Sequence, residues 1–267
     1  MYPTKYHKPD SINQAVAILL ENEDASVLAG GQTLIATMKQ RLASPSDLVD
    51  IRAIPGISGI NVSNGVLTIG AGTTHEDVAT NASVRALCPA LSYLAGKIGD
   101  PAVRHVGTIG GSLANNDPAA DYPAGLLALN AIVKTNLRDI PIDKFFQGLF
   151  GTILDVGEII TAVEVPPSER TAYIKFSQPA SRFSIVGVFV ALTNGRARVA
   201  ITGCGQEGVF RHTKIEEALS VDWSSNSIGE LSMATDDLIS DLHASAEYRA
   251  KLINVLSKRA VEASLLK

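Results

Sequence analysis

Two pairs of adjacent glycines, each set among small residues, constrain this chain more than any other feature. The longer stretch runs from Thr108 to Asp121 as TIGGSLANNDPAAD, with Gly110 and Gly111 near its start. A glycine pair lets another molecule approach the main chain where a Cβ atom would block it. Exposed amides there can donate to phosphate oxygens, and the neighbouring Ser, Asn and Asp side chains add further polar groups.

The second pair, Gly30 and Gly31, lies between a strand-like apolar run and a helix-like one, in the stretch from Val27 to Leu34. At such a junction the first N–H groups of the helix point toward whatever the glycines admit. We therefore expect the two stretches to hold the two phosphates of one dinucleotide. Ordinary tight turns are the alternative interpretation of either pair taken alone.

The composition argues against several classes of protein. With 267 residues, 46% of them hydrophobic, the chain can bury a sizeable core and form two or three compact units. A formal net charge of -4 and a pI near 5.7 argue against nucleic acid or an anionic membrane as partner. No run approaches the roughly 18 apolar residues of a membrane span, and the first residues lack the apolar core of a signal peptide. We expect a cytoplasmic protein.

Cysteine and histidine usage predicts no metal site. Cys88 and Cys204 are far apart in the sequence, and two thiols cannot supply the four ligands that an iron–sulfur cluster usually takes. There is no Cys-x-x-Cys pair for zinc, and the five histidines are scattered, which favours surface or capping roles for them. Any redox chemistry of this chain must therefore come from an organic cofactor.

The spacing of apolar residues predicts an α+β protein that begins with a small α/β unit. Residues 11–21 carry apolar side chains at helical spacing, and 34–42 form a second helical stripe. Short buried strands are expected at 27–29 and 48–51. This alternation of strand and helix covers about residues 1–55.

A larger mixed unit is expected over residues 56–167. It opens with a hairpin around Asn64-Gly65, a favoured turn pair between two apolar runs. The elements expected after it are a helical region, a further helix and two strands, over residues 75–97, 122–130, 131–134 and 159–165.

The turn-rich run at 166–169 marks the predicted boundary between a cofactor-binding domain of residues 1–167 and a C-terminal domain of residues 168–267. In the second domain, apolar runs at 184–192 and 196–202 indicate another hairpin. A capping-box pattern and a long amphipathic stretch then predict two helices. We expect a short antiparallel sheet backed by helices.

The two glycine stretches together resemble a known family. AGGQTL and TIGGSLANNDPAADYPA are similar to motifs of the FAD-binding medium subunit of molybdenum hydroxylases, the group that contains aerobic carbon monoxide dehydrogenase and the bacterial xanthine dehydrogenase-type enzymes. The similarity continues through Gly157-Glu158-Ile159-Ile160 and Lys175 to the end, so it covers essentially the whole chain.

The resemblance implies which residues bind FAD. The first glycine stretch would hold the diphosphate through main-chain amides, with a hydroxyl added by Thr33; helix capping is the alternative for Gln32 and Thr33. The second stretch would lie on the other side of the cofactor, and Asp121 would bond a cofactor hydroxyl or amino group. The residues implied are Val27, Leu28, Ala29, Gly30, Gly31, Gln32, Thr33, Leu34, Ile98, Thr108, Ile109, Gly110, Gly111, Ser112, Asp121, Ile160, Lys175 and Phe183.

Three of these residues concern the flavin ring. Ile160 and Lys175 match family positions close to the flavin, where a Lys near the N1–C2 carbonyl edge would stabilise negative charge on the reduced ring. Phe183 matches a region where a side chain can cover one face of the ring, with plain core packing as the alternative. Here Ser177-Gln178-Pro179 departs from the more basic run usual in the family after the Lys.

The resemblance also implies a division of labour among subunits. The substrate would react at molybdenum in a molybdopterin-containing large subunit, and electrons would pass through the 2Fe-2S clusters of a small subunit to FAD on this chain. From there they would reach quinone, NAD or oxygen. No residue of this chain is expected to act as acid, base or nucleophile, and no His suits covalent flavin attachment, so the FAD is expected to be non-covalent.

Two other functions stay open on the sequence. A stand-alone FAD-dependent oxidoreductase of a related fold would need its own substrate pocket, for which no acid–base constellation is evident. A non-catalytic binding module that has lost its cofactor is disfavoured by the intact glycines. P-loop nucleotide hydrolysis is excluded, since neither glycine pair is followed by Gly-Lys-Ser or Gly-Lys-Thr.

Overall fold

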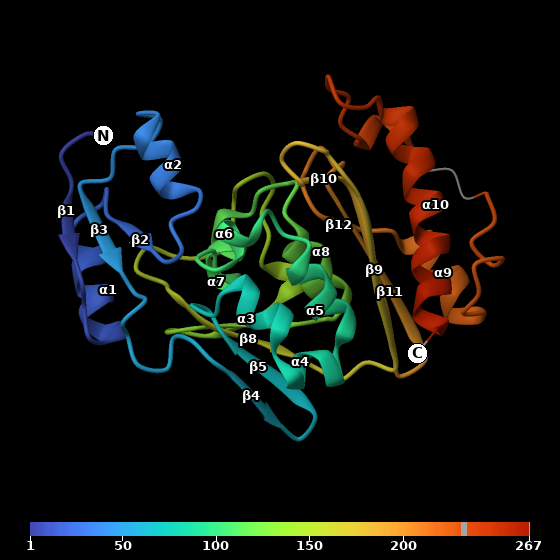
Figure 1. Ribbon diagram of the computed structural model, residues 1–267, viewed down its shortest axis with the longest axis horizontal. Coiled ribbons are helices and arrows are strands. Elements are labelled where there is room, and N and C mark those ends of the chain that lie inside the picture. The colour runs from blue at the N-terminus through green and yellow to red at the C-terminus, as the bar shows by residue number, and fades with distance from the viewer. Residues whose placement is uncertain (231–233, 267) are drawn as a thin grey trace.

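The structure is a computed structural model that describes residues 1–230 and 234–266. Three separate sheets follow one another along the chain, with helices packed around them (Figure 1). The fold is α+β, as the sequence predicts. Within the described residues, no helix is long and apolar enough to cross a bilayer.

The N-terminal unit is a three-stranded parallel sheet with two helices. Its strand order is β1-β3-β2, formed by Lys5–His7, Asp47–Asp50 and Ser26–Leu28. Helix α1 (Ile12–Glu21) buries Ala15 and Leu19, while α2 (Leu34–Lys39) follows the first glycine pair. Each strand–helix alternation that the sequence predicts is present, and it leaves the β2–α2 connection free to form a binding loop.

The middle unit contains a five-stranded antiparallel sheet of order β4-β5-β8-β6-β7. The predicted hairpin is confirmed, because Asn64 and Gly65 both have positive φ, 51° and 78°, as a type I′ turn requires. The strands are Ile60–Ser63 (β4), Val66–Gly70 (β5), Ile132–Thr135 (β6), Asp139–Pro141 (β7) and Ile160–Val165 (β8).

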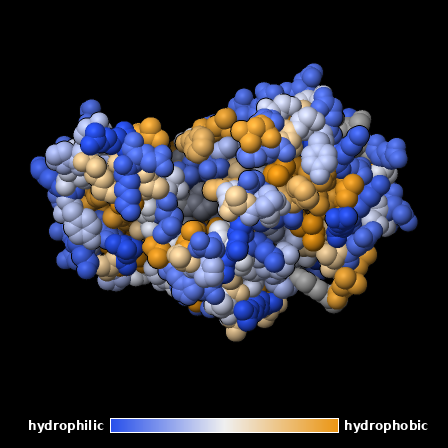
Figure 2. All heavy atoms as spheres, turned by 45° about the horizontal axis from the view of Figure 1, so that its top comes forward, coloured by the Kyte–Doolittle hydropathy of each residue, from blue (hydrophilic) through white to orange (hydrophobic). Residues whose placement is uncertain are grey.

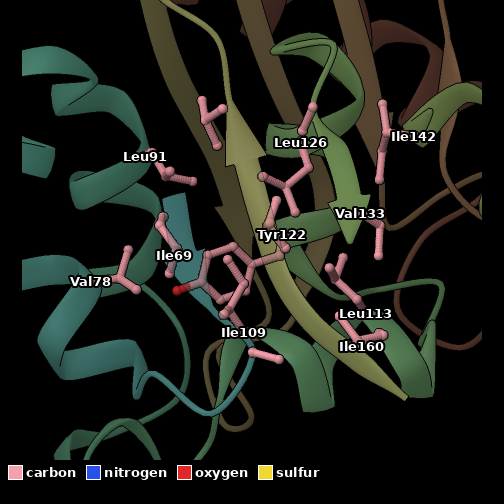
Figure 3. Close-up of a cluster of buried hydrophobic side chains, with 14 of the residues drawn as sticks. Ile69, Val78, Leu91, Ile109, Leu113, Tyr122, Leu126, Val133, Ile142 and Ile160 are labelled. Carbon is pink, nitrogen blue, oxygen red and sulfur yellow. The ribbon is translucent and has the colours of Figure 1, made fainter. Parts of the chain in front are cut away.

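Helices pack on this sheet and bury most of the molecule's core. They are α3 (His75–Thr80), α4 (Ala82–Leu87), α5 (Pro89–Gly96), α6 (Pro101–Arg104), α7 (Ile109–Asn115), α8 (Asp121–Ala128) and the 3-10 turn η1 (Ile142–Lys144). Every residue of α8 is buried. Figure 3 shows Tyr122 of this helix among Ile69, Ile109 and Leu113, so α8 joins the sheet to the helices.

The C-terminal unit is a four-stranded antiparallel sheet of order β12-β11-β10-β9, covered by α10 (Ala246–Leu265). Its other elements are β9 (Arg170–Ser177), β10 (Ser184–Thr193), β11 (Arg196–Thr202), β12 (Phe210–Arg211), α9 (Thr213–Val221) and the 3-10 turn η2 (Thr235–Asp237). The second predicted hairpin is present around Asn194-Gly195. Helix α8 packs against β10 and β11, which joins this unit to the middle one. The domain boundary at 167/168 stays a prediction.

Candidate cofactor site

A cavity of about 560 Å³ opens between the N-terminal unit and the rest of the molecule. In Figure 2 the surface is hollowed between the N-terminal unit, at the left, and the remainder. All but two of the residues predicted to bind the cofactor line this cavity; the exceptions are Ile109 and Lys175. Segments distant in the sequence, from the β2–α2 loop to Phe183, therefore meet around one cavity.

The first glycine stretch presents a run of unused donors. From Ala29 to Thr33, five consecutive backbone N–H groups have no acceptor among the described residues. Thr33 occupies the N-cap position of α2, but its side chain makes no capping hydrogen bond. Consecutive backbone N–H groups that are free to donate, at the wall of a cavity, are suited to bind an anion such as a diphosphate.

Both glycines of this stretch are required by geometry. A Cβ atom at Gly30 would lie 2.4 Å from the Val106 carbonyl oxygen and 2.7 Å from the Gly107 Cα atom. Gly31 has φ of 68°, in the left-handed region that disfavours a side chain. The β2–α2 loop can therefore lie directly against the backbone that leads into α7.

The second glycine pair differs from the expectation of exposed amides. The backbone N–H groups of Ile109 and Gly110 donate to the carbonyl oxygens of Thr73 (3.1 Å) and Ala71 (2.8 Å), respectively. The N–H of Gly111 donates to the Thr108 hydroxyl (3.2 Å). The pair lies inside α7, with Thr108 as its N-cap. A Cβ atom at Gly110 would lie 2.6 Å from the Ala71 side chain, so this glycine mainly allows close packing.

Ile109 is a predicted site residue that does not line the cavity, and its contact with the cofactor stays a prediction. Its side chain is fully buried in the core with Leu113 and Tyr122 (Figure 3), and it does not reach the cavity. Because Ile109 is the first residue of α7, its side chain anchors the helix that carries Gly111 and Ser112 to the cavity wall.

Lys175 also does not line the cavity, because its ammonium group is engaged elsewhere. Its Nζ lies 2.9 Å from Asp121 Oδ2, and it donates to the carbonyl oxygens of Lys97 (3.0 Å) and Arg182 (2.9 Å). The side chains of Lys175 and Asp121 are each 5% exposed. Lys175 thus ties the segment before Phe183 to the start of α8.

Asp121 is the centre of a buried polar network. In addition to its ion pair with Lys175, Asp121 accepts two hydrogen bonds at Oδ1. One comes from the Tyr173 hydroxyl, and the other comes from Ser184 Oγ, 2.8 Å away. Burial, and then the nearby Asp121 carboxylate, raise the pKa of Tyr173. The network holds β9 and β10 against α8, and it places Asp121 at the cavity wall.

Phe183 lies at the cavity rim with its side chain 48% exposed. Core packing, the alternative considered for it, is therefore wrong. The preceding residue, Arg182, has φ of 63° and donates its backbone N–H to Gln178, so a tight loop presents Phe183. The covering of a flavin face by Phe183 stays a prediction.

His75 is a cavity residue that the sequence analysis missed. It was expected at the surface or in a cap, but it is 5% exposed and lines the cavity. Its Nδ1 atom is buried with no hydrogen-bond partner among the described residues. Burial, and then the positive charge of Arg104, lower the pKa of His75 to about 4. The sequence around it, Thr73-Thr74-His75-Glu76, is polar and gives no sign of burial.

We expect His75 to make the chain less stable in mild acid. The folded chain holds His75 neutral down to about pH 4, whereas an unfolded His takes up a proton near pH 6.5. Since the unfolded state binds more protons in this window, stability falls as pH falls, by about 2 kcal/mol between pH 7.5 and pH 5. Urea unfolding of wild type and His75→Leu at both values measures the difference.

The matched control for that prediction is His105→Gln, since His105 is exposed. The unfolding free energy of His105→Gln should depend on pH as that of the wild type does. In His75→Leu, the part of this dependence that comes from His75 should be absent. Equal pH dependence in wild type and His75→Leu would show that His75 does not titrate as a buried neutral group.

Comparisons with known proteins identify the family of this chain. The family model described as the FAD binding domain in molybdopterin dehydrogenase matches residues 2–168. The carbon monoxide dehydrogenase medium chain of Hydrogenophaga pseudoflava is 31% identical over 276 residues, covering 97% of this chain and 96% of the relative. The medium chain from Afipia carboxidovorans is 33% identical over 273 residues, covering 96% and 95%.

A solved structure is similar over the whole fold. Carbon monoxide dehydrogenase from Hydrogenophaga pseudoflava, in a form lacking the molybdenum-pyranopterin moiety of its cofactor, superposes with a TM-score of 0.87. The identity is 31%, and 99% of each chain is covered. The chain therefore belongs to the family of FAD binding domains of molybdopterin dehydrogenases. It is an FAD-binding oxidoreductase subunit of the medium-subunit type, which confirms the resemblance drawn from its sequence.

Proposed function

We propose that this chain carries non-covalent FAD in a cytoplasmic molybdenum hydroxylase and passes electrons from a partner's iron–sulfur clusters to an external acceptor. The partners would be a molybdopterin-containing large subunit and a 2Fe-2S small subunit. The bound flavin supplies the chemistry, because it accepts electrons one at a time and releases them in pairs. The chain's own residues bind and orient it.

The observation that carries the proposal is the unused N–H run from Ala29 to Thr33 at the cavity wall. These donors would hold the diphosphate, with the Thr33 hydroxyl beside them. They neutralise charge by hydrogen bonding and need no mobile counter-ion. Thr108 and Ser112 would face the cofactor from the opposite side, because both line the same cavity.

Other residues would place the ring end of the cofactor. Asp121 would accept a hydrogen bond from a hydroxyl or amino group of the cofactor. Ile98 and Ile160 would pack against the cofactor, since all three residues line the cavity. Phe183 would cover one face at the rim. We propose that Lys175 is a positioning residue, acting on the site through its bonds to Asp121 and to the Arg182 carbonyl.

The direct test is to add FAD to the purified chain and measure retained flavin after desalting. We expect about one yellow, acid-releasable FAD per chain, with a Kd that calorimetry can measure. A colourless chain that ignores added FAD would contradict the proposal and favour a binding module that has lost its cofactor.

Turnover separates the proposal from the alternative of a stand-alone oxidoreductase. The flavin-loaded chain alone should oxidise no hydroxylase substrate, while the purified native complex should do so and contain molybdenum and iron. Oxidation of such a substrate by the isolated chain would overturn the subunit role.

A further inference from the structure

His75 lies at the wall of the cofactor cavity, and neither nitrogen of its ring is hydrogen-bonded. It is the first residue of α3, where Thr74 is the N-cap, and it is buried although it lines the cavity. Its Nδ1 atom is buried without a partner, and Nε2 also has none among the described residues. Because an unbonded polar group in the interior costs stability, this arrangement points to a role of His75 beyond packing.

The aromatic neighbour of His75 in the core does not supply the missing partner. The Tyr122 ring lies 5.4 Å from the His75 ring, centroid to centroid. The Tyr122 hydroxyl is itself buried without a hydrogen-bond partner among the described residues. Tyr122 does not line the cavity, so of these two side chains His75 is the one that a bound molecule can reach.

The glycine at position 107 leaves the Nε2 atom of His75 uncovered. A Cβ atom at Gly107 would lie 2.6 Å from Nε2, so a larger residue would displace the ring. Gly107 also lines the cavity, and a Cβ atom at Gly30 would lie 2.7 Å from the Gly107 Cα atom. His75 is therefore next to the segment against which the β2–α2 loop lies, and the free N–H groups of that loop suit a diphosphate.

Burial and the neighbouring charge make the His75 ring a neutral donor in the free chain. Burial, and then the positive charge of Arg104, lower the pKa of His75 to about 4. Arg104 is paired with Glu76 (3.0 Å), and neither of these residues lines the cavity. A buried N–H without an acceptor is disfavoured more than an unused lone pair, so the neutral ring carries its proton on Nε2 rather than on Nδ1.

We propose that His75 is a further cofactor-binding residue, which donates a hydrogen bond from Nε2 to a phosphate oxygen of bound FAD. The inference rests on the proposed function, because FAD supplies the acceptor. In the free chain the unbonded imidazole lowers stability, and bound FAD gives Nε2 its partner. Removing both ring nitrogens should therefore weaken FAD binding without destabilising the FAD-free chain.

The test is His75→Leu, which removes both nitrogens at a similar volume. Calorimetry at pH 7.5 should show at least about a tenfold loss of FAD affinity, because a hydrogen bond to a charged phosphate is lost. The urea midpoint of the FAD-free variant should be no lower than that of wild type. His75→Gln keeps a side-chain N–H donor and should recover part of the affinity. The control is His105→Gln, at an exposed position, which should change neither measurement.

Phosphorus NMR of the bound FAD tests which part of the cofactor His75 contacts. A phosphorus resonance should shift between wild type and His75→Leu, while the flavin absorption spectrum stays the same. Unchanged phosphorus resonances, or full FAD affinity in His75→Leu, would overturn the inference. If His75→Leu does not fold, His75→Phe takes its place, because it restores a ring against Tyr122.

Two further outcomes separate this inference from packing and from the proposed function. A loss of affinity that comes with a lower urea midpoint of the FAD-free chain, and that His75→Gln does not recover, would overturn the inference in favour of a packing role. A wild-type chain that retains no FAD contradicts the proposed function itself. FAD binding by wild type that His75→Leu leaves intact contradicts the role of His75 alone.

Discussion

Replacing Gly30 by alanine should weaken FAD binding by at least about 100-fold, a loss of about 2.8 kcal/mol. The added Cβ atom would lie 2.4 Å from the Val106 carbonyl oxygen and 2.7 Å from Gly107 Cα. Both contacts are with backbone, which cannot rotate away as a side chain can. The β2–α2 loop must therefore move off the segment before α7, and its free N–H groups move with it. Calorimetry with FAD measures the change.

Two further glycine variants make this prediction specific. Gly96→Ala is the control, because its Cβ atom would meet only the Ala79 side chain, at 3.7 Å, which is ordinary contact. Gly111→Ala would meet the Thr108 hydroxyl at 2.9 Å, the movable end of a side chain, so its effect should be smaller than that of Gly30→Ala. Full FAD affinity in Gly30→Ala would show that the close loop contact is not part of the site.

Short-range chemistry explains what the sequence could predict. Both hairpins follow from Asn-Gly pairs, whose two residues adopt the positive φ that the turn needs, 51° and 70° at Asn194 and Gly195. The β2–α2 loop follows from a strand pattern, a glycine pair and a helix pattern in succession. Such signals involve neighbouring residues only, so they are readable without the fold.

The misplaced features depend on contacts between distant segments. Glycine disfavours helix, yet Gly110 lies in α7 because the helix must pack against Ala71. The local sequence predicts a surface position for His75, but in the fold it lies against Gly107 and the Tyr122 ring and is buried. The ion pair of Lys175 cannot be predicted from neighbouring residues, because its partner, Asp121, lies 54 positions away.

That pairing leads to the second large effect: Lys175→Met should destabilise the FAD-free chain by about 3–5 kcal/mol. Methionine keeps the length of the side chain but leaves the Asp121 carboxylate, 5% exposed, without its cation. The carbonyls of Lys97 and Arg182 lose their donor as well. Urea unfolding without FAD measures the loss, so cofactor binding does not enter the result.

A double-mutant cycle with Asp121→Asn shows whether the pair is the cause. If the buried charge dominates, Lys175→Met with Asp121→Asn should be more stable than Lys175→Met alone, because a neutral amide costs less to bury than an unpaired carboxylate. Lys134→Met is the control, since the Lys134–Asp139 pair is 32% and 57% exposed and should contribute less than about 1 kcal/mol. If Lys175→Met loses as little stability as Lys134→Met, the hydrogen bonds from Tyr173 and Ser184 are sufficient to stabilise the buried Asp121 carboxylate. Lys175 would then not be needed to hold the segment before Phe183 in place.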